Sequence, residues 1–329
     1  MRSVNPRNPR ASVPVRSVLR LLIVCVAALG LLGGCYFSPS VPTRIQPGQN
    51  FPDPGILATT GGYYRYSTNA YGMNVPMSHA TSPTGAWSWP VDAFPNPPSW
   101  VLGHIWGPDV VKIDNYYYLY YSAAIAWDGS AFGEHAIGVA RSTSPAGPFT
   151  AVGPQPLYRD PQHRGVIDPE VVGGLAGERY LLWSVDWGPG GFGSSVNRSI
   201  QSQRLASPTS RTGSIGTLLT ANRNTWENGV VEAPTMVSAG GNFYLFYSGG
   251  LFSQNYATGY AYCGGSPLNA CLRYPNDDTP VVFTGWNGLT NPGGVDMVPF
   301  YYGVWLAIGH VQVGANREPY VSYVTWTGP

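Results

Sequence analysis

Five acidic residues recur at comparable places along this chain of 329 residues. Each stands nine to twelve residues before an aromatic residue in a short segment that has the composition of a half-buried strand. Carboxylates gathered at one point can divide the work of catalysis, because one can donate a proton while another activates water or attacks carbon. The acids are Asp53, Asp109, Asp168, Glu232 and Asp296, and the aromatic residues are Tyr64, Tyr118, Tyr180, Tyr244 and Trp305.

The spacing of these segments predicts the fold that must position the acids. The steps between the aromatic residues are 54, 62, 64 and 61 residues, which suits a repeated sheet unit of about four short strands. No segment has a convincing apolar period of 3.6 residues. A linear solenoid and a closed propeller both fit such repeats, but a propeller leaves no long open edges and sets its first strands around a channel. We therefore predict an all-β, five-bladed β-propeller over residues 51–329, with the acids at one mouth of the channel.

Three of the acids suit the cleavage of a glycosidic bond. This reaction needs an acid that protonates the leaving oxygen and a carboxylate that activates water or attacks carbon. Glu232 has apolar neighbours and the longer side chain, which suits the acid, and Asp53 stands where the first strand begins, which suits the base. Asp168 would lie between them, where its charge would raise the pKa of Glu232 and orient it.

Four motifs resemble glycoside hydrolase family 43. They are Asp53-Pro54, Trp106-Gly-Pro-Asp109, Ile167-Asp-Pro169 and Val231-Glu-Ala-Pro234, in this order. The resemblance implies a five-bladed propeller that hydrolyses arabinose-, xylose- or galactofuranose-type bonds with inversion of configuration. Motif by motif, it implies Asp53 as general base, Asp168 as the modulator of the pKa and Glu232 as general acid.

Two rival functions remain open. A propeller on the cell envelope could bind carbohydrate without cleaving it. The loss of one of the three acids would favour this alternative, but all three are present. A retaining hydrolase of the fructan or sucrose type would share the propeller and the three acids. Its typical motifs do not occur around Asp53, Asp168 and Glu232, so this alternative is disfavoured.

The sequence predicts neither a cofactor nor a metal ligand. The stretch Gly293-Gly-Val-Asp-Met297 lacks the His that many members of the resembled family carry in the last blade, which disfavours a structural calcium in the channel. His310 ends the strand-like segment of the fifth unit, and its position fits a channel residue and a structural residue equally.

Substrate-binding side chains are predicted near the same mouth of the channel. Aromatic rings there stack on sugar faces, whereas packing between blades is the competing role for each single ring. The candidates are Trp106, Asp109, Trp127, Trp187, Phe252 and Arg317.

The first residues have the features of a targeting signal. Residues 1–34 contain five Arg and an apolar run over 18–32, and they end in Leu-Gly-Gly before Cys35. This pattern resembles a bacterial lipoprotein signal, with Cys35 lipidated after cleavage and the protein held on the membrane outside the cytoplasm. A plain secretory signal and an uncleaved anchor are the alternatives. Residues 35–50, which are rich in Pro, Ser and Gln, are predicted to be a tether.

Composition limits the partners. A net charge of +1 gives no indication of nucleic-acid binding, and we expect a monomer whose partner is an oligo- or polysaccharide. Cys263 and Cys271 stand eight residues apart and are predicted to form a disulfide in an oxidising compartment.

Overall fold

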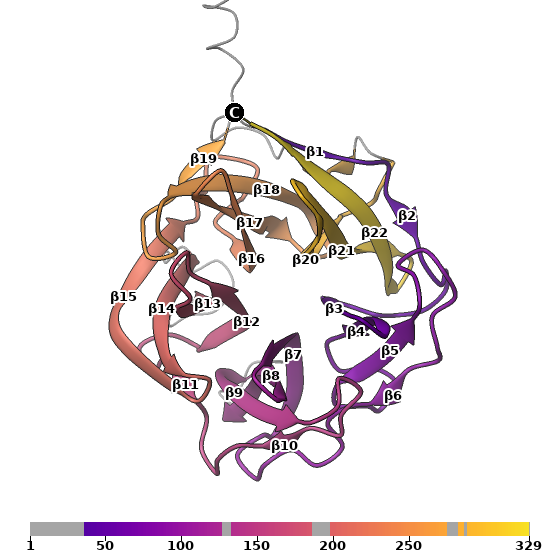
Figure 1. Ribbon diagram of the computed structural model, residues 1–329, viewed down its shortest axis with the longest axis vertical. Helices are drawn as coiled ribbons and strands as arrows, with labels where there is room; N and C mark the ends of the chain where they lie inside the picture. The colour runs from indigo at the N-terminus through magenta and orange to yellow at the C-terminus, as the bar shows by residue number, and fades with distance from the viewer. Residues whose placement is uncertain (1–35, 127–132, 186–197, 275–281, 286–287, 329) are drawn as a thin grey trace, which may run out of the picture. The chain divides into compact units, whose positions relative to one another are not determined.

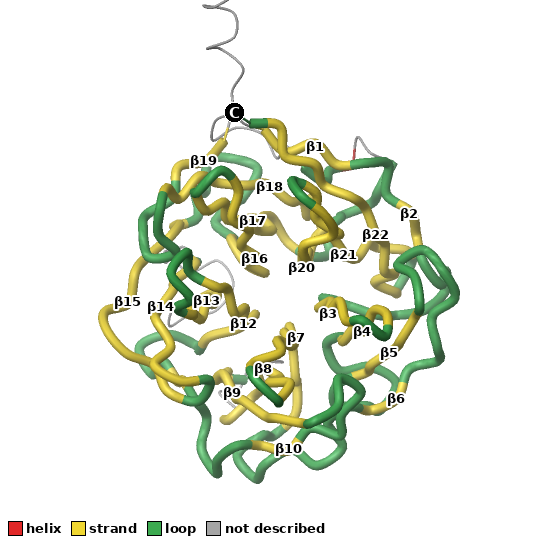
Figure 2. The backbone as a smooth tube through the Cα atoms, viewed as in Figure 1, coloured by secondary structure: helices red, strands yellow, loops and turns green. Residues whose placement is uncertain are grey.

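The structure, a computed structural model, describes residues 36–126, 133–185, 198–274, 282–285 and 288–328. The compact unit spans Phe37–Trp326. It contains five antiparallel sheets arranged as blades, which confirms the predicted β-propeller (Figure 1). No α-helix is present among the described residues, and Figure 2 shows that strands and loops make up nearly all of the backbone.

The blades follow one another along the chain. Blade 1 contains β3 (Gly55–Thr59), β4 (Gly62–Tyr66), β5 (Pro76–Ala80) and β6 (Val91–Asp92). Blade 2 contains β7 (Gly103–Ile113), β8 (Tyr116–Ala126), β9 (Glu134–Ser142) and β10 (Thr150–Ala151), and β11 (Tyr158–Arg159) also pairs with β9. Blade 3 contains β12 (Val166–Gly173), β13 (Arg179–Val185), β14 (Ser199–Ser207) and β15 (Ser210–Thr220). Blade 4 contains β16 (Val231–Ala239), β17 (Asn242–Leu251), β18 (Gln254–Gly264) and β19 (Leu272–Tyr274).

Blade 5 combines the two ends of the compact unit. It contains β20 (Gly293–Tyr301), β21 (Val304–Val313) and β22 (Asn316–Thr327), and the N-terminal strands β1 (Tyr36–Pro39) and β2 (Thr43–Arg44) pair with β22. The first strand of every blade, β3, β7, β12, β16 or β20, contacts the first strands of the two neighbouring blades. The five first strands therefore form a closed ring around the channel (Figure 1).

The N-terminal strands correct one prediction from the sequence. Phe37 is only 4% exposed, and its ring meets those of Tyr244, Phe246, Tyr260 and Trp305 at centroid distances of 4.9 to 5.7 Å. Residues 37–44 thus belong to blade 5, and the prediction of a free tether is wrong for them. No local pattern reveals this pairing, because β1 pairs with a strand at the far end of the chain.

Packing between adjacent blades forms the core. Aromatic residues of the second strands of blades 2 and 3 point to both faces of the sheet, so that Tyr121 and Tyr120, and Tyr180 and Trp183, join different core clusters. The predicted disulfide between Cys263 and Cys271 is present and links β18 to the segment before β19. In the part of the chain that the structure describes, no helix is long and apolar enough to cross a membrane.

Candidate active site

A backbone feature is repeated near the start of the inner strand of each blade. In every blade one residue adopts a positive φ, between +46° and +57°, and four of the five are followed directly by Pro. In blades 2 to 5 this residue lies within a shift of the strand register, which is a β-bulge. The five residues are Asp53, Gly107, Asp168, Ala233 and Gly294.

This feature separates the acids into two layers and corrects the equivalence inferred from the sequence. Asp53 and Asp168 hold the positive-φ position itself. Asp109, Glu170 and Asp296 stand two residues later, and Glu232 stands one residue before that position. The five acids named from the sequence are therefore not equivalent, and in blade 3 it is Glu170, not Asp168, that holds the place corresponding to Asp109 and Asp296. The distance from the acid to the aromatic residue varies by two to three residues between blades, so it does not distinguish the two layers. The x-Pro-acid pattern shared by 107–109 and 168–170 was the signal that could have found Glu170.

Asp53 is surrounded by groups that favour its ionised form. Arg317 Nη1 lies 2.9 Å from both carboxylate oxygens of Asp53, and the Thr68 hydroxyl donates to Oδ2 at 2.7 Å. Burial of Asp53 opposes ionisation, but the charge of Arg317 and the Thr68 hydrogen bond outweigh it, so the pKa of Asp53 lies below its usual value. The side chain is therefore a carboxylate at neutral pH, as a general base must be.

His310 supports Asp53 as a neutral ring. The Asp53 backbone N–H donates to His310 Nδ1 at 3.2 Å, which leaves the ring proton on Nε2. Burial lowers the pKa of His310 to about 3, against a smaller opposing effect of Asp53. Of the two roles left open by the sequence, this contact with Asp53 places His310 beside the site.

Asp168 is held between two neighbouring blades. Its Oδ2 accepts the backbone N–H of Ala233 at 2.9 Å, which ties blade 3 to blade 4. On the other side, a Cβ atom at Gly107 would lie 2.7 Å from Asp168 Oδ1, so only Gly fits there. The carboxylate of Asp168 is therefore fixed by close backbone approach from both sides.

Glu232 contacts a cation and a phenol. Arg198 Nη1 forms an ion pair with Glu232 Oε2, and the Tyr256 hydroxyl donates to Oε1 at 2.9 Å. Arg198 and Glu232 are both largely buried, with side chains 9% and 12% exposed. An ion pair favours the carboxylate form, whereas a general acid must carry a proton, so Arg198 works against any group that holds Glu232 protonated.

Tyr256 connects the three predicted catalytic acids. Its ring stacks on His310 at 5.8 Å, and only the missing side chain of Gly293 leaves room for it. Burial raises the pKa of Tyr256, and the negative charges of Asp53 and Asp168 raise it further, so both acids act on the same phenol that binds Glu232. The structure thus brings Asp53, Asp168 and Glu232 together around Tyr256. Sequence reasoning missed Tyr256 and Arg198, because neither belongs to the repeated motif.

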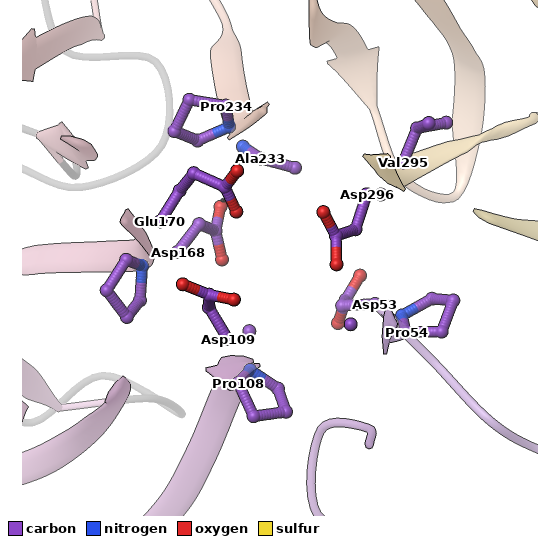
Figure 3. A pocket seen from close by; sticks show the side chains of 14 residues that line it. Asp53, Pro54, Pro108, Asp109, Asp168, Glu170, Ala233, Pro234, Val295 and Asp296 are labelled. Atoms are coloured by element: carbon purple, nitrogen blue, oxygen red, sulfur yellow. Dashed lines mark hydrogen bonds between the residues drawn. The ribbon is translucent and has the colours of Figure 1, made fainter. Parts of the chain in front are cut away.

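The second layer is a cluster of three buried carboxyl groups. One oxygen each of Asp109, Glu170 and Asp296 lies within 4.8 Å of the others, and Figure 3 shows these side chains pointing into one pocket with Asp53 and Asp168. Asp109 accepts the N–H of Val171 and Asp296 accepts that of Ile56, so the cluster joins adjacent inner strands.

The three carboxyl groups of this layer bind protons more tightly than usual. Burial, with the charge of Asp296, raises the pKa of Asp109 well above its usual value, and the same effects together with Asp109 raise that of Glu170. Burial raises the pKa of Asp296 to about 6. The sequence predicted no metal ligand, yet three oxygen donors at this separation suit a hard cation such as Ca²⁺. If a cation binds on the axis, Asp109, Glu170 and Asp296 are the residues that would hold it.

The predicted substrate-binding residues divide into three groups. Arg317 and Phe252 lie together beside Asp53, with the guanidinium carbon 5.1 Å from the centre of the Phe252 ring. Trp106 stacks on His135 at 4.1 Å and precedes Gly107, while Asp109 lines the pocket in the second layer. Trp127 and Trp187, like the predicted lipidation residue Cys35, lie outside the described residues.

Comparisons with known proteins show the family of the chain. The family model Glycosyl hydrolases family 43 matches residues 47–328. A probable arabinan endo-1,5-alpha-L-arabinosidase C from Aspergillus niger is 29% identical over 63% of this chain and 60% of its own length. An extracellular exo-alpha-(1->5)-L-arabinofuranosidase from Streptomyces avermitilis is 26% identical over 74% of this chain and 52% of its own length. The matches thus span little more than half the length of these two relatives.

Solved structures share the fold. A thermostable family-43 glycoside hydrolase superimposes with a TM-score of 0.73 at 21% identity, covering 87% of this chain and 96% of that one. An endo-arabinase from Bacteroides thetaiotaomicron gives a TM-score of 0.68 at 19% identity, covering 86% and 96%. With the family model matching most of the chain, the resemblance read from the four motifs is confirmed. The chain belongs to glycosyl hydrolases family 43.

Proposed function

We propose that the chain is a glycoside hydrolase in which Asp53 activates water, Glu232 protonates the leaving oxygen and Asp168 orients Glu232 and favours its protonated form. The observation that carries the proposal is the contrast between two environments. Asp53 is held ionised by Arg317 and Thr68, whereas Glu232 binds both Arg198 and the neutral hydroxyl of Tyr256, a phenol on which the negative charge of Asp168 also acts. Carboxyl groups with different environments at one site are what acid–base cleavage of a glycoside requires.

Arabinose-type linkages are the proposed substrates, with xylan-type linkages second. The two curated relatives are named for arabinan and arabinofuranoside cleavage, and this chain shares their family. Phe252 and Arg317 stand beside Asp53, where the ring can stack on a sugar and the guanidinium can also bind a hydroxyl.

We propose an inverting mechanism and an extracytoplasmic location. A direct attack of water activated by Asp53 gives inversion, because no covalent glycosyl-enzyme forms. The basic and apolar leader followed by Cys35 supports a membrane-anchored lipoprotein.

Hydrolysis of debranched arabinan, arabinoxylan, xylan and galactan, with aryl furanosides and xylosides alongside, tests the function. We expect activity on arabinose-type substrates and its loss, by about 10²-fold or more, in Asp53→Asn. A well-folded protein that binds these glycans without releasing sugar would support the non-catalytic alternative instead.

A further inference from the structure

The compact unit begins almost at the predicted lipid site. Phe37, its first residue, follows Cys35 by two positions, so their Cα atoms can stand no more than about 7 Å apart. Phe37 is buried and contacts Trp305 at 5.7 Å, and Trp305 pairs with Pro299 at the end of β20. The N-terminal segment therefore enters the propeller beside the β20–β21 turn.

That turn carries an exposed aromatic cluster. Tyr301 is 65% exposed and Tyr302 is 96% exposed, while Phe300 packs on Tyr323 at 4.8 Å and on Tyr301 at 5.3 Å. Phe300 anchors the turn through these contacts, and the two tyrosine rings stand in solvent. Adjacent exposed rings mark interaction sites more often than singly scattered apolar residues do.

The turn lies on the side of the propeller opposite the acids. Every inner strand begins beside the pocket and ends at the hairpin turn that leads to the second strand of its blade. Six residues separate Asp296 from Tyr302, which corresponds to about 20 Å along a strand. We call the side that carries the five hairpin turns, 60–61, 114–115, 174–178, 240–241 and 302–303, the turn face.

Among the described residues, the turns of the turn face in blade 5 and in its two neighbouring blades carry no charged residue. Blade 5 lies between blade 4 and blade 1, and the segments 238–243, 299–305 and 58–63 contain no Asp, Glu, Lys or Arg. Their exposed or partly exposed aromatic residues are Tyr63, Phe300, Tyr301 and Tyr302. Uncharged turns with exposed tyrosines have the composition of protein surfaces at the headgroup level of a bilayer, where the ring is apolar and the hydroxyl stays wet.

We propose that the turn face rests on the lipid bilayer, with Tyr301 and Tyr302 among the headgroups and the pocket directed away from the membrane. This inference rests on the anchoring at Cys35 proposed above. Because no free tether separates Cys35 from Phe37, a lipid on Cys35 holds the edge of blade 5 at the membrane surface. Polysaccharide then reaches the acids from the aqueous side without passing between the protein and the membrane.

Enzymatic iodination of the lipidated protein on vesicles tests the orientation. The full-length protein is processed in a bacterium, purified and inserted into preformed vesicles of neutral phospholipid. Lactoperoxidase, which does not enter a bilayer, then labels accessible tyrosines. Tyr71 is the internal control, since it is 50% exposed and its hydroxyl accepts the N–H of Asn50 on the side of the acids.

Exposure alone predicts that Tyr302 labels more strongly than Tyr71. On vesicles we expect the reverse order, with the label on Tyr301 and Tyr302 largely lost and Tyr71 still labelled. The variant Tyr302→Ser assigns the signal and should leave arabinan hydrolysis unchanged, because the turn lies far from the pocket.

Three results would overturn the proposal. Strong labelling of Tyr302 on a protein whose N-terminal peptide carries the lipid mass would show that the turn face is free, with anchoring intact. Protection that disappears when the protein is diluted tenfold in lipid would show that a second copy, not the bilayer, covers the rings. An N-terminal peptide without lipid would overturn the anchoring and this inference together, while arabinan hydrolysis is tested independently.

Discussion

Arg317 Nη1 lies 2.9 Å from both carboxylate oxygens of Asp53, although the two residues are 264 positions apart in the chain. Asp53 stands two residues before the start of β3 in blade 1, and Arg317 belongs to β22 of blade 5. The contact therefore exists only after the ring of blades has closed. Closure of the propeller and ionisation of the proposed base are in this way linked through one ion pair.

Removing the charge of Arg317 should change the pH dependence of hydrolysis. Arg317 lowers the pKa of Asp53, so Arg317→Met should raise it. Because the base must be ionised, the acid limb of the kcat/KM profile should move to higher pH. Arg317→Lys keeps the charge and serves as the control, with a smaller displacement. If the acid limb does not move in Arg317→Met, Arg317 does not set the pKa of the general base.

Replacing Glu232 should penalise poor leaving groups most. Glu232→Ala should slow arabinan hydrolysis by about 10²- to 10⁴-fold, the usual contribution of a general acid. Aryl glycosides should be affected far less, because their leaving oxygen hardly needs a proton. Tyr256→Phe removes one hydrogen bond to Glu232 and should have a milder effect of the same kind. If Glu232→Ala slows the hydrolysis of both substrate classes equally, Glu232 is not the general acid.

Arg198 and Asp168 should displace the alkaline limb in opposite directions. The Arg198 ion pair favours ionised Glu232, so Arg198→Met should favour the protonated acid and move the alkaline limb of the pH–rate profile upward. Asp168→Asn removes a negative charge and should move this limb downward. Profiles recorded with an unactivated oligosaccharide measure both effects. If the alkaline limb moves in the same direction in both variants, Arg198 and Asp168 do not have opposing effects on Glu232.

The second layer of acids should make the folded protein less stable as the pH rises. Asp109, Glu170 and Asp296 have raised pKa values in the folded state, so the folded protein holds protons that the unfolded chain releases between the ordinary carboxyl range and about pH 6 or above. Their contribution to stability is present at low pH and is lost as the pH rises through these values.

Glu170→Gln should reduce this loss, because it removes one of the three charges without changing the shape of the side chain. We expect the fall in Tm between about pH 5 and about pH 8 to be smaller in Glu170→Gln than in the unaltered protein, by at least about 2 °C. Thermal unfolding in the presence of a chelator measures the fall. If, without a chelator, the Tm of the unaltered protein rises with pH, and if this rise disappears when a chelator removes Ca²⁺, a bound cation neutralises the cluster.

The sequence predicted the fold because the blade is a repeated local unit. Each inner hairpin, such as β16 with β17, is built from neighbours in the chain, so its strand and turn residues are visible in one short stretch. The N-terminal strand β1 was missed because its partner β22 is almost 300 residues away. Strand pairing over that distance leaves no mark on composition, and 36–44 therefore looked like a tether.

The candidate site was predictable only where its residues belong to local sequence motifs. Asp53, Asp168 and Glu232 carry motifs of their own, and the structure brings them together around Tyr256. Tyr256, Arg198 and Thr68 belong to no motif, since each reaches the site from the second or third strand of its blade or from the loop next to it. Their roles depend on how far each strand extends toward the acids, which only the folded backbone determines.

The stereochemistry of the first product tests the central proposal, direct attack of water activated by Asp53, most directly. Time-resolved ¹H NMR of arabino-oligosaccharide hydrolysis reports which anomer appears before mutarotation. We expect β-arabinofuranose, the inverted configuration, from an α-linked substrate. An α-anomer formed first would show a covalent intermediate and would contradict the assignment of Asp53 as a general base.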